Sequence, residues 1–544
     1  MKYILSALVL VAAFASCAPK TDLVSKANVR NTPVLALKGV NDIASIELSS
    51  VTDTSYNICG VSLALGSTCG LEDISKVSIL SGDREIAAVD TRIEGKRADI
   101  RIPCEIPVRG QRASFGIGIT TADAVNLDNK IAIGGVKVIT SSGTVDSELT
   151  GAAQLRMGVA LRMWGQDGVD NCRIPGLAVT PKGTILAIYD ARRGRNADLQ
   201  GDIDICYNRS TDGGRTWSEM KTAMDMGEWG GLPQKFNGVS DPCILVDDKT
   251  GDIFVSACWM HGVIDPKTGE WVGGLTEESG EWNHQWRENG SLPGYDVHQS
   301  CQWMVVKSTD DGLTWSEPMN FTRQVKPEDY CLMINAPGAG IVLEDGTFVI
   351  PAQGKREDET HFSTLITSRD GGRNWSAGTP VIEDHSVHSN ECMAVQLSDG
   401  SIMLNMRSNK NRGNHERNGR MVYVTKDLGQ TWTEHPTSGH VLTEPTCQGS
   451  LLKHMYEDAE GREHELLLFF NPNDPDEREH YTMKCSLDEG MTWPEDMWLE
   501  VDEYSGRGYS CMISLDNDTV GVLYEGSGAC MVYQRIKLED LVKF

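Results

Sequence analysis

Three side chains with useful chemistry lie at comparable points of the chain, each at or just past the end of an apolar run. They are Arg192, Arg407 and Tyr524. A guanidinium group binds carboxylates and phosphates through paired hydrogen bonds. A tyrosine hydroxyl with a neighbouring base can transfer a proton or act as a nucleophile. The pattern predicts a site for an anionic ligand if the fold brings these three chain positions together.

A motif that occurs five times indicates how the fold does so. Its pattern is Ser/Thr-x-Asp-x-Gly-x-Thr/Asn-Trp, in which the Asp accepts backbone N–H bonds within a tight turn and the Gly supplies a positive φ. The Trp is expected to pack into the layer below. The copies are Ser210–Trp217, Ser308–Trp315, Ser368–Trp375, Thr425–Trp432 and Ser486–Trp493. Self-similarity of this kind is typical of repeat architectures.

A second repeat, a polar turn followed by an apolar run, occurs six times and alternates with the first. The runs follow Gly183, Gly251, Gly346, Gly400, Gly461 and Asp518. Continuous apolar runs suit strands buried on both faces, and we expect these runs to be the inner strands of propeller blades. Residues 151–544 are therefore predicted to form an all-β, six-bladed β-propeller with an insertion at 266–298 in its second blade. The ends of inner strands meet at one mouth of the central channel, where Arg192, Arg407 and Tyr524 would lie.

The chain before position 150 has a different sequence pattern. It lacks the repeated motif and contains no Trp, and it shows short alternating runs such as 98–103 and 131–139. Alternation of this kind predicts half-buried strands. We expect residues 18–150 to form a separate, smaller β-sandwich, which either binds carbohydrate or braces the propeller.

The first seventeen residues predict export. Lys2 precedes an apolar stretch over 4–15, and Ala15-Ser-Cys17 follows, as in a secretory signal. The small residues before Cys17 also resemble a bacterial lipobox, which would make Cys17 a lipidated first residue; the alternative is a plain signal peptide cut near Ala15. The expected location is periplasmic, or on the outer membrane or cell surface of a Gram-negative bacterium, with membrane contact only through the lipid anchor.

Charge and cysteine spacing exclude several classes of partner. The net charge of −27 argues against nucleic acid and anionic membranes, and it requires a local cationic cluster if the ligand is an anion. None of the fifteen cysteines forms a CxxC pair and the histidines lack ligand spacing, so no metal and no other cofactor is expected.

The chain resembles a known family. The five repeated motifs resemble the Asp-boxes of sialidases, and Cys172-Arg-Ile-Pro175 is similar to that family's Phe/Tyr-Arg-Ile-Pro motif. The segment before the propeller is similar to the β-sandwich of sialidases from gut Bacteroidetes. The resemblance implies a retaining exo-α-sialidase that hydrolyses terminal sialic acid from glycoproteins, glycolipids and oligosaccharides. Cys172 departs from the motif at a position that packs and does not react.

The resemblance also implies a set of substrate-binding residues. Sialic acid carries a carboxylate on its anomeric carbon, and the family binds it with three arginines, which correspond to Arg173, Arg407 and Arg478. Arg507 is an open alternative for the third. Arg192 and Asp241 match residues that contact the 4-hydroxyl side of the sugar.

The implied catalytic residues are a tyrosine, a glutamate and an aspartate. A carboxylate nucleophile would be repelled by the substrate carboxylate, and sialidases use tyrosine instead. Tyr524 matches the nucleophile and Glu391 its base. Asp198 matches the acid/base that protonates the leaving oxygen; Asp190, Asp202 and Asp204 are nearby alternatives for this role.

Two other functions fit the same propeller. One is a non-catalytic lipoprotein that binds sialylated glycans, and the complete set of Tyr524, Glu391 and Asp198 argues against it. The other is a trans-sialidase, for which the same residues would serve.

Overall fold

The structure is a computed structural model that describes residues 22–50, 55–199, 201–265, 267–268, 270–281, 290–410, 413 and 418–542. The predicted signal over residues 1–17 and the predicted lipidation of Cys17 lie outside the described residues. Within those residues the regular structure is strand, apart from α1 (Thr322–Val325) and short 3₁₀ turns. None of the helices described is both long and apolar enough to span a membrane.

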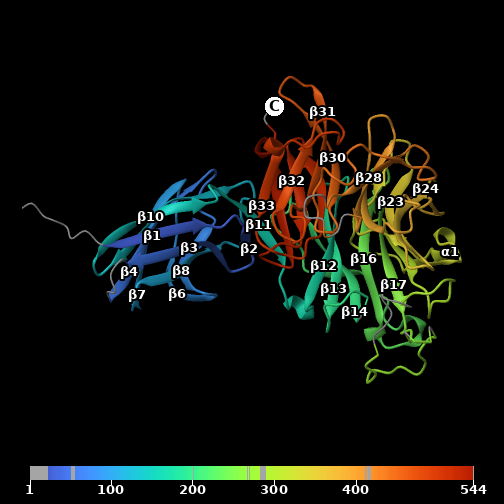
Figure 1. Cartoon of the computed structure of the whole chain (residues 1–544), viewed down its shortest axis with the longest axis horizontal. Helices are drawn as coiled ribbons and strands as arrows, with labels where there is room; N and C mark the ends of the chain where they lie inside the picture. Colours follow the sequence, from blue (N-terminus) through green and yellow to red (C-terminus); the bar gives the residue numbers. More distant parts are fainter. Residues whose placement is uncertain are drawn as a thin grey trace, which may run out of the picture.

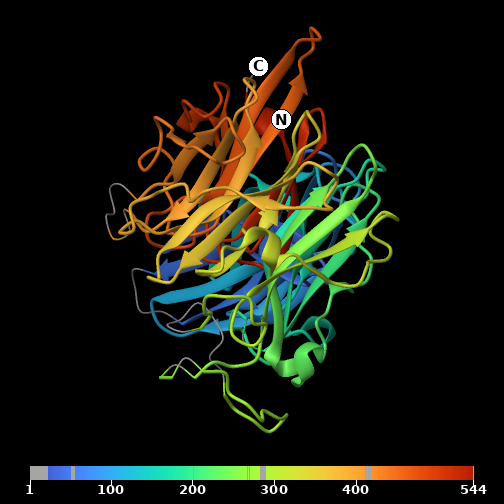
Figure 2. The ribbon, with the colours of Figure 1, turned by 90° about the vertical axis from the view of Figure 1, so that its right-hand side faces the viewer.

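The chain from residue 155 onward folds into four-stranded antiparallel units that follow one another around a ring, as a β-propeller (Figures 1 and 2). The first three are β12 (Asn171–Val179), β13 (Ile185–Arg193), β14 (Asp202–Ser210) and β15 (Lys221–Met224); β16 (Asn237–Val246), β17 (Ile253–His261), β18 (Gln302–Ser308) and β19 (Met319–Asn320); and β20 (Tyr330–Asn335), β23 (Phe348–Arg356), β24 (His361–Ser368) and β25 (Ser376–Ala377). Two-residue strands β21 (Gly338–Ala339) and β22 (Ile341–Val342) pair beside them.

The remaining three units complete the ring. They are β26 (Ser389–Gln396), β27 (Ile402–Ser408), β28 (Met421–Thr425) and β29 (Thr433–Glu434); β30 (Ser450–Glu457), β31 (Glu463–Pro472), β32 (Tyr481–Ser486) and β33 (Trp498–Asp502); and β34 (Ser510–Asp516), β35 (Thr519–Tyr524), β36 (Met531–Lys537) and β11 (Leu155–Arg162). The prediction of an all-β propeller is confirmed.

The fourth strand of the last unit is β11, which comes from the beginning of the propeller and closes the ring. β11 pairs antiparallel with β36, with Val159 opposite Tyr533 and Ala160 opposite Val532. The two ends of the repeat region are thus held together by a sheet ladder. The sequence pattern did not predict this pairing, because β11 belongs to no repeat.

The innermost strand of each unit is its first strand, which corrects one expectation. First strands of neighbouring units contact each other around the channel, as β12 does with β16 and β34, and β30 with β26 and β34. The apolar runs that were predicted to be inner strands are the second strands, β13, β17, β23, β27, β31 and β35. Both positions are covered on both faces, so a continuous apolar run does not distinguish them.

Bulges occur at matching places in three of the first strands. The pairing register shifts between Arg173 and Gly176 in β12, between Ser240 and Cys243 in β16, and between Ser389 and Cys392 in β26. Ile174 (φ 61°) and Asp241 (φ 60°) take left-handed backbone conformations that cost energy for residues with a Cβ. Bulges re-aim side chains, and these aim theirs at the channel mouth.

The repeated motif forms the turn that its residues predict. In the third copy, Asp370 Oδ1 accepts backbone N–H bonds from Arg373 at 3.1 Å and Asn374 at 2.9 Å, and Gly372 has φ 79°. The Trp375 ring is 4% exposed, and its Nε1 donates to the Gly372 carbonyl at 3.0 Å. These turns link third to fourth strands, away from the channel.

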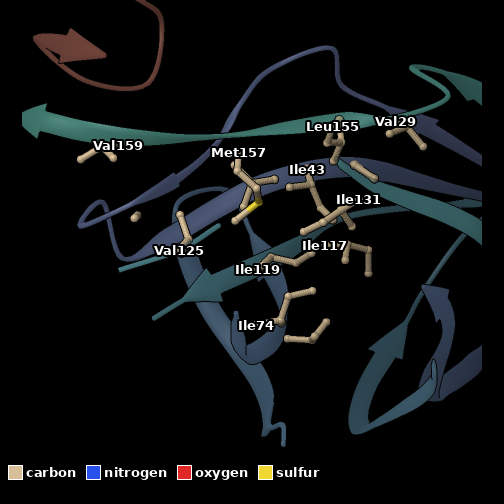
Figure 3. Packing of buried hydrophobic residues seen from close by; sticks show 14 of the residues in the cluster. Val29, Ile43, Ile74, Ile117, Ile119, Val125, Ile131, Leu155, Met157 and Val159 are labelled. Atoms are coloured by element: carbon tan, nitrogen blue, oxygen red, sulfur yellow. The ribbon is translucent and has the colours of Figure 1, made fainter. Parts of the chain in front are cut away.

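The N-terminal strands, on the left of Figure 1, pair into one continuous set that also joins β11 and the last unit, and their apolar side chains share one core. Their bounds are β1 (Leu23–Val29), β2 (Val34–Ala36), β3 (Val40–Ser50), β4 (Tyr56–Ser67), β5 (Ile74–Ser81), β6 (Arg84–Asp90), β7 (Arg97–Val108), β8 (Arg112–Thr121), β9 (Lys130–Thr140) and β10 (Gly143–Gly151). β2 pairs with β11 of the propeller. Figure 3 shows Leu155 and Met157 of β11 packing beside Ile43 and Ile131, so the apolar core continues from these strands into the propeller.

Candidate active site

A polar pocket of about 260 Å³ opens at the mouth of the channel. First strands and second strands from several units contribute to it. Its lining residues are Ile174, Asp198, Asp241, Gln353, His361, Asn390, Glu391, Arg407 and Tyr509. Five of the predicted positions, or their immediate neighbours, therefore meet in one cavity.

Tyr509 and Glu391 form the centre of the pocket. The Tyr509 hydroxyl donates a hydrogen bond to Glu391 Oε1, and Arg407 Nη1 donates to the Tyr509 hydroxyl oxygen at 3.0 Å. Arg407 Nη1 also pairs with Glu391 Oε2 at 2.7 Å. Burial, and then the neighbouring Glu391 charge, raise the pKa of Tyr509 well above its ordinary value. The phenol is therefore neutral at rest and touches the carboxylate that can take its proton.

Three guanidinium groups surround the same tyrosine. The Cζ atoms of Arg173 and Arg478 lie 5.4 Å and 5.6 Å from the centre of the Tyr509 ring, and Arg407 contacts its hydroxyl. These arginines come from three different units and together could bind a carboxylate. Cations over an aromatic face are attracted by the ring, which helps to hold the cluster when it is empty.

Glu525 fixes Arg173 and the backbone around it. Its Oε1 accepts from Arg173 Nε at 2.7 Å and from the Ile174 N–H at 2.8 Å, and its Oε2 accepts from the Tyr509 N–H at 3.2 Å. Glu525 is 1% exposed. A buried charge needs such partners, and these contacts tie the first and last units together directly below the pocket.

Gly508 makes room for Arg478 beside the tyrosine. Its φ is 98°, and a Cβ there would lie 2.6 Å from Cys447 Sγ and 2.9 Å from Arg478 Cδ. Any other residue would displace Arg478, whose Nη1 donates to the Arg507 carbonyl at 2.6 Å.

On the opposite side of the pocket, Arg192 binds the carboxylates of Asp198 and Asp190. The fully buried Arg192 donates from Nη1 to Asp198 Oδ1 at 2.6 Å and from Nη2 to Asp190 Oδ2 at 2.8 Å. Asp190 Oδ1 in turn accepts the Asp241 N–H at 3.0 Å. Burial opposes ionisation of Asp198, but Arg192 and Arg173 outweigh it and lower the pKa of Asp198. Burial and the nearby carboxylates raise the pKa of Asp241, which favours its protonated, hydrogen-bond-donating form.

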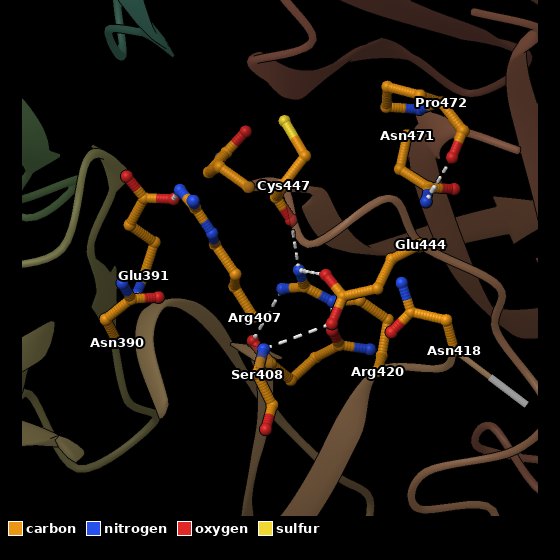
Figure 4. A network of polar contacts seen from close by, with 12 residues as sticks. Asn390, Glu391, Arg407, Ser408, Asn418, Arg420, Glu444, Cys447, Asn471 and Pro472 are labelled. Atoms are coloured by element: carbon orange, nitrogen blue, oxygen red, sulfur yellow. Dashed lines mark hydrogen bonds and ion pairs between the residues drawn. The ribbon is translucent and has the colours of Figure 1, made fainter. Parts of the chain in front are cut away.

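A second buried network supports Arg407 from behind (Figure 4). Glu444 Oε2 pairs with Arg420 Nη1 at 2.7 Å, and both side chains are 0% exposed. Glu444 Oε1 accepts the N–H of Ser408, the residue next to Arg407, at 3.1 Å. Arg420 also donates to the Asn405 side chain on the same strand and to the Cys447 carbonyl, each at 2.6 Å. The end of β27, and with it Arg407, is thereby fixed in place.

Tyr524 is not part of the pocket, which corrects the prediction for this residue. Its ring is fully buried between Phe470 and Tyr481, at centroid distances of 5.4 and 5.3 Å, and its hydroxyl donates to Gln534 Oε1 at 3.2 Å. Tyr524 ends β35, a second strand, and points between sheets. Tyr509 immediately precedes β34, a first strand, and faces the channel.

The competing residues fall outside the pocket. Asp202 and Asp204 pair with Arg193, and Arg507 is exposed on the surface. The pocket residues that sequence reasoning missed are Tyr509, Gln353, His361 and Asn390, together with Glu525 below them. The position of Tyr509 in the sequence could have indicated its role. It stands directly before β34, and Asn390 and Glu391 stand near the start of β26, so all three lie at the beginning of a first strand.

No group of three or more His, Cys, Asp or Glu side chains in the described part of the chain could hold a metal ion. The arrangement instead offers fixed cations for a carboxylate, a phenol paired with a base, and a half-exposed acid across the pocket. These are the groups needed to cleave the glycosidic bond of an anionic sugar.

Comparison with known proteins agrees with this chemistry. A family model described as a BNR repeat-like domain matches residues 174–495. A sialidase of Bacteroides fragilis (strain YCH46) is 39% identical over 426 residues, covering 78% of this chain and 71% of that protein. A sialidase of Micromonospora viridifaciens is 32% identical over 382 residues, covering 67% of this chain and 51% of that protein.

The solved structure of the Hadza microbial sialidase Hz136 matches with a TM-score of 0.80 at 31% identity, over 95% of this chain and 100% of that one. The chain thus belongs to the sialidases of the BNR repeat family. Its activity is that of an exo-α-sialidase, a glycoside hydrolase whose substrates are sialylated glycans.

Proposed function

We propose that the enzyme hydrolyses terminal α-ketosidic sialic acid with retention of configuration, through a covalent intermediate on Tyr509. The observation that carries this proposal is the Tyr509–Glu391 hydrogen bond inside a ring of three arginines. A neutral phenol can approach an anomeric carbon that bears a carboxylate, where a charged nucleophile would be repelled. The Glu391 carboxylate is already in contact with the proton that must leave.

Arg173, Arg407 and Arg478 bind the substrate carboxylate. Bidentate guanidinium–carboxylate pairs are strong and directional, and a local cluster is needed because the whole chain carries a charge of −27. Asp241, whose raised pKa favours the hydrogen-bond-donating form, faces the hydroxyl side of the ring and would fix its orientation. Arg192, predicted to contact the same side, is fully buried behind Asp198 and Asp190 and positions Asp198 instead.

The first chemical step forms the Tyr509 Oη–C2 bond and breaks the glycosidic C2–O bond. Glu391 takes the phenolic proton while the acid form of Asp198, the minor form because its pKa is lowered, gives its proton to the leaving oxygen. In the second step Asp198 takes a proton from water, the water oxygen attacks C2, and Tyr509 leaves and regains its proton from Glu391. Asp198 suits this exchange because its side chain is 46% exposed and can reach solvent.

Hydrolysis of a fluorogenic α-sialoside by the wild type, Tyr509→Phe and Arg173→Ala tests the proposal. We expect release by the wild type and a loss of at least about 100-fold in each variant, the scale of losing a nucleophile or a charge-assisted contact. Saturable binding of sialic acid without release would instead indicate a sialoglycan-binding protein.

We also propose that residues 22–151 are an accessory β-sandwich that braces the propeller. Asp540 after β36 pairs with Lys130 of this segment and, at 2.6 Å, with Arg156 of β11, and the cores are continuous. Export as a lipoprotein through Cys17 is part of the proposal; mass spectrometry of the mature N-terminus in the native cell would show the lipid or its absence.

A further inference from the structure

A second pocket of about 210 Å³ adjoins the arginine side of the active site. Its lining residues are Trp164, Asn171, Ser505, Gly506, Arg507, Glu525, Gly526, Ser527, Ala529 and Cys530. The wall between the two pockets is Glu525, whose other contacts are Arg173 and the Tyr509 backbone. A ligand here would lie beside the substrate carboxylate site, and Asn171 of the lining stands opposite Arg192, the partner of Asp198, in the β12–β13 ladder.

The tryptophan at the rim of this pocket is exposed but held in a fixed loop. Trp164 is 52% exposed, which alone would be ordinary. The loop behind it contains Gly165, Asp167 and Gly168, all with positive φ. The buried Arg162 clamps this loop from below, with Nη1 at 2.7 Å from Asp167 Oδ2 and Nη2 at 3.3 Å from the Gln166 carbonyl. The buried Arg162 guanidinium thus fixes the loop next to the exposed Trp164 indole.

The same pocket offers a cation that is free to bind a ligand. Arg507 is exposed, and its guanidinium forms no ion pair with any residue in the described part of the chain. Glu525 does not cancel it, because both Glu525 oxygens already accept bonds from Arg173 and from backbone N–H groups. The hydroxyl and amide groups of Ser505 and Asn171 complete a polar floor.

We propose that this pocket binds a second sialic acid residue of an oligosialyl chain, an inference that rests on the proposed function. The Trp164 face would take the apolar side of the sugar, as aromatic rings present flat apolar surface with little loss of conformational freedom. Arg507 would pair with its carboxylate. The two pockets together would make the enzyme more efficient on substrates with adjacent sialic acids than on singly sialylated ones.

Hydrolysis of sialyllactose and of α2,8-disialyllactose by wild type, Trp164→Ala and Arg507→Ala tests this. We expect each variant to keep its kcat/KM on sialyllactose within about twofold, and to lose roughly tenfold on disialyllactose through KM, the scale of one charge-assisted contact. The matched controls are Trp229→Ala, an exposed tryptophan that lines neither pocket, and Arg215→Ala on an Asp-box turn.

Equal losses on both substrates, or no loss on either, would overturn the proposal. A loss in Trp164→Ala without one in Arg507→Ala would also overturn it, in favour of a neutral sugar. Failure of the wild type to release sialic acid from either substrate would instead overturn the proposed function. Calorimetric titration of Tyr509→Phe with both glycans gives a readout without turnover: tighter binding of disialyllactose, lost in the Arg507→Ala double variant, is expected.

Discussion

Tyr509 donates its hydroxyl proton to a hydrogen bond with Glu391, a residue 118 positions away in the chain and two units away around the ring. Because the pKa of Tyr509 is raised by burial and by Glu391, the phenol ionises only as its proton passes to this partner. The pair therefore acts as one unit.

Tyr509→Phe and Tyr524→Phe have opposite expected effects. The first removes the nucleophile and should lower kcat by at least about 100-fold. The second removes only the bond to Gln534, at a cost of about 1 kcal/mol in the free energy of unfolding. Parallel kinetics and thermal unfolding of the two variants check this. Activity lost in Tyr524→Phe and retained in Tyr509→Phe would reverse the assignment.

Asp198→Asn should discriminate between leaving groups. The variant cannot protonate the glycosidic oxygen, so it should lose about 10²–10⁴-fold on sialyllactose and much less on an aryl sialoside whose phenolate leaves unaided. The lowered pKa of Asp198 also gives a pH dependence. Because the acid form is required, sialyllactose turnover should fall as the pH rises, with a shallower fall for the aryl sialoside. Identical losses on both substrates would contradict the acid role.

Glu444→Gln tests whether the buried network positions Arg407. Gln can still accept the Ser408 N–H, but it leaves the buried Arg420 charge uncompensated, which destabilises a protein by roughly 3–5 kcal/mol. A shifted β27 would weaken carboxylate binding, so the affinity ratio between a sialic acid inhibitor and its methyl ester should shrink toward one. Arg420→Met/Glu444→Leu, which removes both charges, is the companion variant if the single one does not fold. An unchanged affinity ratio in a folded variant would mean that the Glu444–Arg420 pair stabilises the fold and does not position Arg407.

Asp502 should make stability depend on pH. Burial raises its pKa to about 6, and it accepts bonds from the Ser527 N–H and hydroxyl. The folded state then holds a proton that the unfolded state loses near pH 4, so this contribution is full below about pH 4 and is lost as the pH rises to about 6. Asp502→Asn mimics the protonated form. The Tm difference between variant and wild type should therefore grow in favour of the variant from pH 4 to pH 7, and a constant difference would contradict the raised pKa.

The repeats were enough to predict the propeller, because each motif copy folds into its turn through contacts within a few residues. Ring closure by β11 was not predictable in that way, since it depends on pairing across almost four hundred positions. The same limit explains Tyr524: its position at the end of an apolar run was clear, but periodicity does not reveal which strand of a unit faces the channel.

The polar residues of the site also divide into those that the sequence predicted and those that it did not. Arg173, Asp198, Asp241, Glu391, Arg407 and Arg478 were all selected from the sequence through the family resemblance, and the structure brings them to the pocket or to Tyr509. Glu525 and Glu444 act through other residues, by bonds to Arg173 and to the backbone beside Arg407. Contacts of that kind leave no local pattern in the sequence.

Trapping with 2,3-difluorosialic acid tests the central claim most directly. The fluorine substituents slow the second step more than the first, so a covalent adduct accumulates and can be located by peptide mass spectrometry. We predict one modified residue, Tyr509, with no label in Tyr509→Phe and full labelling of Tyr509 in Tyr524→Phe. Label on Tyr524 or on a carboxylate, or turnover without any adduct, would contradict the account.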